Sequence, residues 1–537
     1  MKWLLRFTVL SALLFLTPSS LLPQGTANLR VVSHVDPLPP SSNFKYGEVT
    51  GAGDLAILGG FANNTRVWIY DLANKTQPVL LAAIPVNTPS WDVQVHGRYL
   101  FIALSGRMEW YDIIDPTQPQ LVKRFEPSPS INPHTFFVAG NTLYVADLVS
   151  SGIRIFDITD KKNPKPLADI IDRSWSIHDM TVIRRRLYGA WIFGSAGVLL
   201  ADVKNPAAPQ ELSKARYPQA GTHNAWPTED EKYILTTDEI SPSRNNLKIW
   251  DARTPGKLTQ VNEYQVPNAA SPIHNTYVRG RYAYMSHYCD GLRIVDVADP
   301  AQPREVAFYD FNTSTGCASF NSNWGVHVFS NLIYASDMNT GLYVLEFDNH
   351  VAANFTGAVV DNDTGQPLRG AMVYFRDEYP STRTNSAGNF DIPWFKNDTV
   401  KVVTEALGYL PDTTTIMTSA ANKTTATIRL KRLSTAVTAS SIGPAEFELL
   451  HSYPNPASAA NTQIIFRLPA RAEVQLEVYN IYGQRVRQLL RAAREPGEHR
   501  FAWDGTDEAG KAVTAGIYIL RLRAGALSRS RRVTVLR

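Results

Sequence analysis

The stretches GIRIFDITDKKNP (152–164) and GLRIVDVADPAQP (291–303) decide the fold of this chain. Each begins with glycine, alternates apolar and polar residues, and ends in a turn that contains Asp and Pro. Alternation with a period of two predicts a half-buried β-strand, and Asp and Pro favour the turn that follows it. Both stretches therefore predict the same strand-and-turn unit.

Five weaker copies of this unit occur along the chain. They read RVWIYDLANKTQP (66–78), RMEWYDIIDPTQP (107–119), GVLLADVKNPAAP (197–209), LKIWDARTPGK (247–257) and GLYVLEFDN (341–349). The copies recur about every 44 residues, the length of the four short strands that make one blade of a β-propeller. Seven copies predict an all-β, seven-bladed propeller without long helices.

The seventh copy stops after its third strand, so its blade lacks an outer strand. The segment NLRVVSHVDP (28–37) precedes the first copy and has the pattern of an outer strand such as REVAFYD (304–310). We expect this N-terminal strand to complete the seventh blade and close the ring, which removes an open sheet edge. The predicted propeller spans residues 28–349.

These units resemble the LVIVD repeat. The whole region resembles the choice-of-anchor B type of LVIVD propeller through THNAWPTEDEKYILTTDE (222–239) and IHNTYVRGRYAYMSHYCDGLRI (273–294). The resemblance implies an extracellular propeller that is attached by differing anchors. It implies no particular reaction.

A small antiparallel β-sandwich is predicted behind the propeller, at residues 353–432. Its strands are separated by turn residues in NFTGAVVDNDTGQPLRGAMVYFRD (354–377) and TNSAGNFDIPWF (384–395). The segment resembles the carboxypeptidase regulatory-like domain, which has a transthyretin-like fold and serves as a stalk or interaction module. The chain contains no H-E-x-x-H zinc motif, so this resemblance implies no peptidase activity.

A linker rich in Ser, Thr and Ala is expected at 433–446, and a last domain at 447–537. In this domain four motifs follow one another: Y-P-N-P (453–456), Y-N-I-Y-G (479–483), W-D-G (503–505) and A-G-I-Y (515–518). They resemble the bacterial type IX secretion-system C-terminal sorting domain, an Ig-like sandwich related to FlgD modules. The resemblance implies export across the outer membrane, with the type IX machinery as a partner. An ordinary Ig-like interaction module is the alternative.

The ends and the composition of the chain agree with export. The start, MKWLLRFTVLSALLFLTP (1–18), joins two basic residues to a short apolar run and predicts a signal peptide over residues 1–25. No later segment predicts a transmembrane helix, and a formal charge of +4 over 537 residues predicts no nucleic-acid groove. We therefore expect a secreted or outer-membrane surface protein, in which Cys289 and Cys317 are a possible disulfide.

Alignment of the repeats predicts a ligand-binding face at one end of the central channel. Histidine or tryptophan occupies one equivalent position just before the innermost strand, at His134, His178, His223, His274, Trp91 and Trp324. The ends of the second strands bring acidic side chains and one more histidine to the same face, namely Asp147, Asp238, Glu239, His287 and Asp337.

Three interpretations of the histidines stay open. They clamp neighbouring strands, they line a polar ligand-binding face, or His178, His223 and His274 bind a divalent metal, for which neutral imidazoles are common ligands. No nucleophile elbow, phosphate loop or CxxC motif is present, so no catalytic residue and no further cofactor is predicted. The leading hypothesis is a surface protein that binds an extracellular ligand or protein. The alternatives are an exported metal-dependent enzyme and a structural envelope component.

Overall fold

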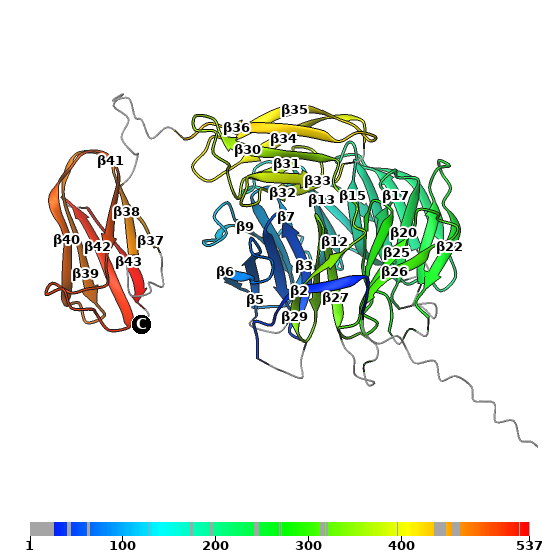
Figure 1. Cartoon of the computed structure of the whole chain (residues 1–537), viewed down its shortest axis with the longest axis horizontal. Coiled ribbons are helices and arrows are strands. Elements are labelled where there is room, and N and C mark those ends of the chain that lie inside the picture. Colours follow the sequence, from blue (N-terminus) through cyan, green and yellow to red (C-terminus); the bar gives the residue numbers. More distant parts are fainter. Residues whose placement is uncertain are drawn as a thin grey trace, which may run out of the picture. The chain divides into compact units, whose positions relative to one another are not determined.

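The computed structural model describes residues 26–535 apart from short gaps (Figure 1). The secondary-structure elements in these residues are all β-strands. The gaps are residues 40–43, 62–64, 128, 172–175, 194–196, 241–245, 268, 270, 312–316, 318–319, 395, 434–446, 454–461 and 526. The all-β prediction is therefore confirmed for the described part of the chain. This part also contains no helix long and apolar enough to cross a membrane.

Three sequence predictions lie outside the described residues. They are the signal peptide at 1–25, nearly all of the linker at 433–446, and residues 454–456 of the Y-P-N-P motif. The chain divides into two compact units, Met1–Leu433 and Ser434–Arg537.

Antiparallel four-stranded sheets of the kind that forms propeller blades follow one another through the first unit. Their innermost strands are β3 (Tyr46–Ala52), β7 (Ser90–His96), β11 (Pro133–Ala139), β15 (Ser176–Ile183), β19 (Thr222–Pro227), β23 (Thr276–Arg279) and β27 (Asn323–Phe329). The second strands are β4 (Leu55–Gly60), β8 (Tyr99–Leu104), β12 (Thr142–Asp147), β16 (Arg186–Phe193), β20 (Tyr233–Asp238), β24 (Tyr282–Ser286) and β28 (Leu332–Asp337).

The third strands carry the repeated G-(L/I)-R-I-x-D pattern. They are β5 (Arg66–Asp71), β9 (Arg107–Asp112), β13 (Gly152–Asp157), β17 (Gly197–Asp202), β21 (Asn246–Asp251), β25 (Leu292–Asp296) and β29 (Gly341–Phe347). The outer strands are β6 (Val79–Pro85), β10 (Gln120–Phe125), β14 (Lys165–Ile171), β18 (Gln210–Arg216), β22 (Thr259–Gln265), β26 (Arg304–Tyr309) and β2 (Leu29–Val35). A short strand, β1 (Thr26–Ala27), extends the sheet of β26.

The sheets form a closed ring. Each innermost strand contacts the next one along the chain, and β27 of the last sheet contacts β3 of the first. The N-terminal strand β2 pairs with β29, so a strand from the start of the chain completes the last sheet. Second and third strands are buried on both faces, as β4 shows along its whole length, whereas outer strands such as β6 are mostly exposed or half-buried. This burial gradient places the core between the sheets.

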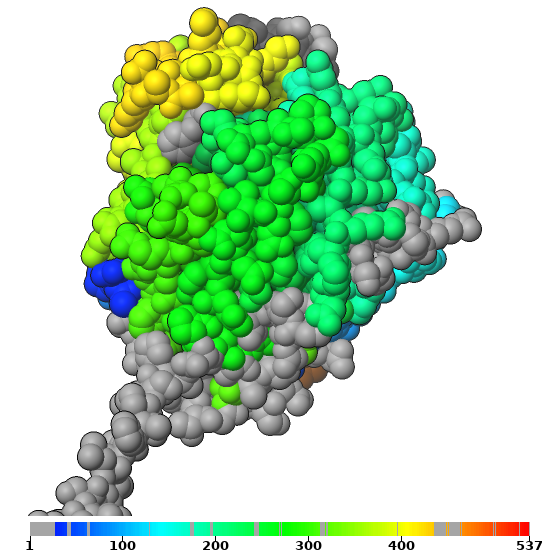
Figure 2. Space-filling model, turned by 90° about the vertical axis from the view of Figure 1, so that its right-hand side faces the viewer, coloured from blue at the N-terminus to red at the C-terminus, as the bar shows by residue number. Residues whose placement is uncertain are grey.

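A β-sandwich covers one end of this ring. Its sheets consist of β33 (Asn389–Ile392), β30 (Phe355–Asp361) and β36 (Thr424–Leu430), and of β32 (Ser381–Arg383), β31 (Met372–Phe375), β34 (Asp398–Glu405) and β35 (Asp412–Thr418). Phe355, Phe390 and Trp394 fill its core. Figure 2 shows the sandwich in yellow packed directly on the sheets in green.

The two cysteines of the chain form a disulfide. Cys289 follows β24 and Cys317 precedes β27, and their Cα atoms are 5.7 Å apart. The bond ties together two loops at the end of the ring that the sandwich leaves free.

The second unit is a two-sheet sandwich. Its sheets consist of β37 (Glu448–Tyr453), β38 (Thr462–Leu468) and β41 (Gly497–Trp503), and of β40 (Arg485–Arg494), β39 (Ala472–Asn480), β42 (Gly516–Ala524) and β43 (Leu527–Val535). Trp503 of the W-D-G motif is buried in the core, and its indole N–H donates to the Thr506 carbonyl at 2.8 Å. The Trp503 side chain of this motif therefore links the core of the second unit to the turn that follows β41.

Candidate functional site

Seven aromatic side chains form a closed ring at the free end of the channel. Neighbouring centroids around this aromatic ring are 4.1–5.3 Å apart. In order, its members are Phe61, Trp91, His134, His178, His223, His274 and Trp324. The six residues that the repeats placed at one equivalent position thus lie side by side.

Phe61 is the member of the aromatic ring that the sequence did not indicate. The first repeat has Gly47 at the equivalent position, and a Cβ there would lie 3.6 Å from the Phe61 ring. Glycine leaves the space, and Phe61 enters it from the end of β4 instead of from an inner strand. Only the missing side chain at Gly47 signals this replacement.

A layer of polar side chains lies one residue further along the inner strands and links neighbouring sheets. Its hydrogen bonds run from the Phe136 amide to Asp92 (3.0 Å), Thr135 Oγ1 to the His178 carbonyl (2.8 Å), Asn224 to Asp179 (2.6 Å), the Thr276 amide to Asn224 (3.3 Å) and Asn275 to Glu48 (2.9 Å). Hydrogen bonds in a low-dielectric interior fix the relative position of the groups they join.

The last sheet contributes a glycine to this layer. A Cβ at Gly325 would collide with the Glu48 carboxylate, so the glycine gives Glu48 the room to reach Asn275. The hydrogen bond between Asn275 and Glu48 passes the last sheet and links the sixth sheet to the first.

The channel strongly perturbs ionisable groups. Burial raises the pKa of Asp92 to about 7 and that of Asp179 to about 6, and it raises the pKa of Glu48 well above its ordinary value. Burial also lowers the pKa of His134 to about 4 and that of His274 to about 3. The imidazoles are therefore neutral near pH 7, which is the form that binds metals and accepts hydrogen bonds.

Backbone groups of the next sheet contact three of the histidine rings. His274 Nδ1 lies 2.6 Å from the Trp324 carbonyl and joins the last two sheets as a clamp. The His178 ring contacts the backbone of His223, and the His223 ring contacts that of His274. Burial lowers the pKa of both rings well below the ordinary histidine value.

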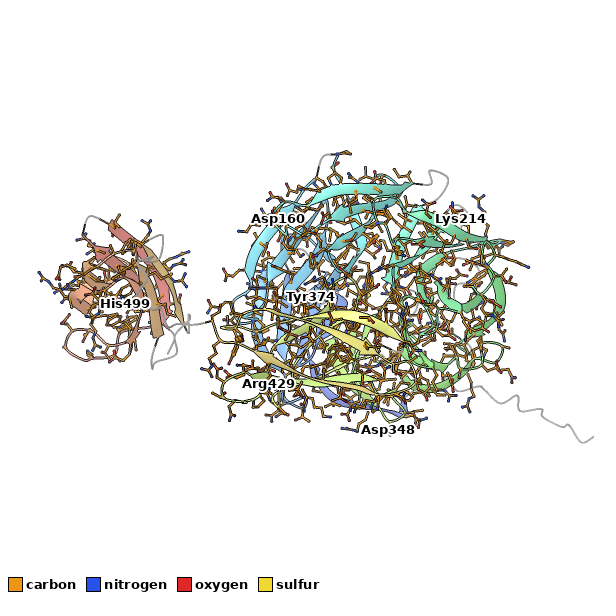
Figure 3. All side chains as sticks on the ribbon, turned by 90° about the horizontal axis from the view of Figure 1, so that it is seen from above. Asp160, Lys214, Asp348, Tyr374, Arg429 and His499 are labelled. Carbon is orange, nitrogen blue, oxygen red and sulfur yellow. A yellow bond between two sulfur atoms is a disulfide. The ribbon has the colours of Figure 1, made fainter. Side chains whose placement is uncertain are left out.

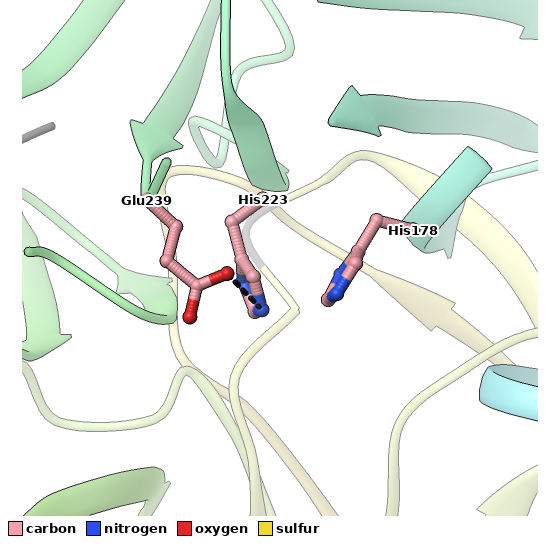
Figure 4. A group of neighbouring side chains, drawn as sticks. All are labelled: His178, His223 and Glu239. Carbon is pink, nitrogen blue, oxygen red and sulfur yellow. Dashed lines mark ion pairs between the residues drawn. The ribbon is translucent and has the colours of Figure 1, made fainter. Parts of the chain in front are cut away.

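One carboxylate joins this pair. His178, His223 and Glu239 each have a potential ligand atom, and these atoms all lie within 4.8 Å of one another (Figure 4). The closest contact is His223 Nε2 to Glu239 Oε2 at 3.7 Å. Glu239, not His274, therefore completes the group of possible metal ligands.

The other acidic candidates serve local structure. Asp147 accepts from the Asn132 amide at 2.8 Å, Asp238 pairs with Lys248 at 2.7 Å, and Asp337 accepts from Ser322 Oγ at 2.6 Å. His287 is fully buried outside the aromatic ring, with Nδ1 3.4 Å from Asp290. These residues lie at the predicted end of the sheets, but their side chains contact neighbouring strands and loops instead of the channel.

The sandwich closes the opposite end of the channel. Tyr379 packs against Phe137 of β11 with 5.0 Å between ring centroids, and Arg279 of β23 pairs with Asp391 of β33 at 3.7 Å. Figure 3 shows the sandwich lying over the ring of sheets, with Tyr374 within the outline of the ring. Between Tyr379 and the histidines lies a cavity of about 120 Å³ lined by Glu48, Asp92 and Asp179.

Exposed apolar side chains lie at the free end, at the ends of the second strands and in the loops that follow them. Val149 is 63% exposed and Phe193 is 55% exposed, and Leu148 and Ile240 are exposed beside them. Clusters of exposed apolar side chains on soluble proteins mark interaction sites. The free end thus combines an apolar rim with a histidine-lined mouth.

Sequence comparisons match three families. The LVIVD repeat matches residues 89–126 and 274–311, the CarboxypepD_reg-like domain matches residues 355–439, and the FlgD Ig-like domain matches residues 455–526. No curated protein matches the chain. These matches confirm the prediction of LVIVD repeats, a carboxypeptidase regulatory-like domain and an Ig-like domain related to FlgD modules.

Several solved structures are similar to part of the chain. The β-propeller domain of Cps50 (Swd1) from Myceliophteria thermophila is 12% identical, over 59% of this chain and 99% of that one, with a TM-score of 0.44. A functionally unknown protein from Desulfotomaculum acetoxidans is 10% identical, over 51% and 89%, with a TM-score of 0.41. The family matches thus identify LVIVD repeats, a carboxypeptidase regulatory-like domain and an FlgD Ig-like domain in this chain.

Proposed function

We propose that this chain is an exported bacterial surface protein whose seven-bladed propeller, of the choice-of-anchor B type, binds an extracellular ligand or protein through its histidine-lined end. The observation that carries this proposal is the asymmetry of the two channel mouths. The sandwich covers one mouth through Tyr379 and Asp391, whereas apolar side chains such as Val149 and Phe193 surround the other. In the described part of the chain, the sandwich covers the first of these two mouths and not the second.

A pair of matched double variants tests which surface binds. Val149→Glu with Phe193→Glu places two charges on the apolar rim. Leu80→Glu with Leu121→Glu places the same charges on the outer strands β6 and β10, where both leucines are about half exposed. The measurement is binding of the purified, fluorescently labelled full chain to cells of the producing bacterium from which the gene has been deleted. We expect the rim variant to lose most binding and the outer-strand variant to keep it. Equal binding by both would contradict the assignment of the face.

We propose that the second unit is the export signal read by the type IX secretion machinery. Support comes from the sequence motifs that follow one another in this unit. Two described residues of these motifs belong to the sandwich: Tyr518 is buried and donates to the Thr514 carbonyl at 2.8 Å, and Asp504 accepts from the Thr506 amide at 3.0 Å. Deletion of residues 447–537 followed by cell fractionation tests this role. Retention in the periplasm is the expected result, and normal surface delivery would show that the assignment is wrong.

An exported metal-dependent enzyme is the second candidate function. The observation that favours it is the proximity of His178, His223 and Glu239, because two histidines and one glutamate also hold catalytic zinc in some hydrolases. In this case, loss of the metal abolishes turnover of a hydrolysable substrate. If the protein is a binding platform alone, the metal serves structure or ligand recognition.

A further inference from the structure

We propose that His178, His223 and Glu239 form a binding site for one divalent first-row transition metal ion, with zinc as the expected occupant. The site lies at the mouth of the channel and connects the fourth and fifth sheets, because His178 belongs to β15, His223 to β19 and Glu239 to the loop after β20. This inference does not depend on the export route or on the identity of the extracellular ligand.

The geometry needs little rearrangement. The three ligand atoms lie within 4.8 Å of one another, and His223 Nε2 is 3.7 Å from Glu239 Oε2. Zinc bonds of about 2.0–2.1 Å in a tetrahedral site require ligand atoms about 3.4 Å apart. Small side-chain rotations bring the three groups to this spacing.

Backbone contacts position both histidine rings. Only 3% of His223 is exposed. A backbone group of the next sheet contacts each ring, at His223 for His178 and at His274 for His223. In metal sites the ring nitrogen that does not bind the metal is typically held by such a partner, which directs the other nitrogen at the metal.

The residues around the site orient the carboxylate. Tyr288 donates its hydroxyl hydrogen to Glu239 Oε1 at 2.6 Å, and the Glu239 amide donates to the Gly221 carbonyl at 2.9 Å. These contacts leave Oε2 directed at His223. Hydrogen-bonded partners that hold ligands in this way are typical of metal sites.

The ligand set selects the kind of metal. Two imidazoles and one carboxylate suit zinc, iron or copper, whereas calcium and magnesium prefer oxygen ligands. His274 is not one of the three residues whose potential ligand atoms lie within 4.8 Å of one another. Three protein ligands leave a coordination position open for water or for a bound molecule.

The test uses the full chain without a histidine tag, stripped with a chelator and titrated with zinc chloride in a calorimeter. We expect one zinc ion per chain. His178→Ala, His223→Ala and Glu239→Gln should each weaken binding at least about 100-fold, and Tyr288→Phe about 10-fold, as expected for a residue that holds a ligand. Cobalt(II) gives a second readout, because its visible absorption reports coordination by the protein.

The matched control is His96→Ala. His96 is as deeply buried as His223 and both its ring nitrogens lack partners among the described residues, but it lies near the sandwich, against Tyr374. This variant should bind zinc like the unaltered protein. Circular dichroism confirms folding, and Glu239→Gln, which keeps the size of the side chain, decides the question if an alanine variant does not fold. Absence of zinc binding, or unchanged binding by folded Glu239→Gln and His223→Ala proteins, would overturn the proposal.

Discussion

The substitution Gly325→Ala should open the polar layer that links the sheets. The added methyl group would occupy space that the Glu48 carboxylate now fills, and Gly325 has no positive φ, so the backbone itself accepts alanine. Glu48 must therefore move, which breaks its 2.9 Å hydrogen bond with Asn275. Loss of one buried hydrogen bond costs about 1–3 kcal/mol, and overpacking costs about 1–3 kcal/mol more. We expect the first unit to lose about 2–6 kcal/mol of stability.

The assay is thermal and urea unfolding of the full chain, monitored by tryptophan fluorescence and calorimetry so that the two units are followed separately. A double-mutant cycle isolates the mechanism. In a Glu48→Ala background the carboxylate is absent, so Gly325→Ala should cost less than about 1 kcal/mol. Gly516→Ala is the control for the substitution itself, because nothing lies near the position that its Cβ would occupy. An equal cost of Gly325→Ala in both backgrounds would refute the proposed contact.

Three further perturbations test other parts of the structure. Burial raises the pKa of Asp92 to about 7, so the folded state should lose stability as pH rises from about 4 to 7. Asp92→Asn should remove roughly 2–4 kcal/mol of that loss. Equal melting-temperature profiles of the two proteins from pH 4 to 8 would argue against this effect of Asp92. Tyr379→Ala removes the ring that packs against Phe137 and should weaken docking of the sandwich by about 2–3 kcal/mol, seen as faster proteolysis between the two domains. Cys289→Ser opens a loop of 28 residues closed by the disulfide and should cost about 3 kcal/mol, whereas an unchanged unfolding midpoint would show that the bond adds no stability.

The repeats made much of the site predictable. Because every repeat places its innermost strand in the same way, the alignment alone brought His134, His178, His223 and His274 to one end of the channel, where the structure places them. The same logic did not reveal Phe61, since the chain there departs from the repeat and fills the space beside Gly47 from another strand.

Side-chain partners were the limit of the sequence prediction. The pattern placed Asp147 and Asp337 near the channel mouth, but each carboxylate accepts hydrogen bonds from its own loop. It grouped His274 with His178 and His223 as possible metal ligands, whereas the structure groups Glu239 with that pair. Such choices depend on distances of a few ångströms, which no periodicity encodes.

The position of the sandwich also lay beyond the sequence. Arg184 and Arg185 both adopt positive φ values, at 51° and 60°, in the turn between β15 and β16. That conformation disfavours residues other than glycine, asparagine and aspartate. The two side chains reach the sandwich, where Arg184 lies over the Trp394 ring and Arg185 pairs with Glu378 at 3.2 Å. The docking contacts offset the cost of this turn, and they become visible only when both domains are present.

X-ray absorption at the zinc edge tests most directly that the histidine-lined mouth is a binding site. The full chain carrying one equivalent of zinc should show two imidazole nitrogens and at least one oxygen at about 2.0–2.1 Å from the metal. This signature should disappear when His178 and His223 are both replaced by alanine. A shell of water oxygens alone, or an identical spectrum from the double variant, would contradict the assignment of a metal site to this end of the propeller.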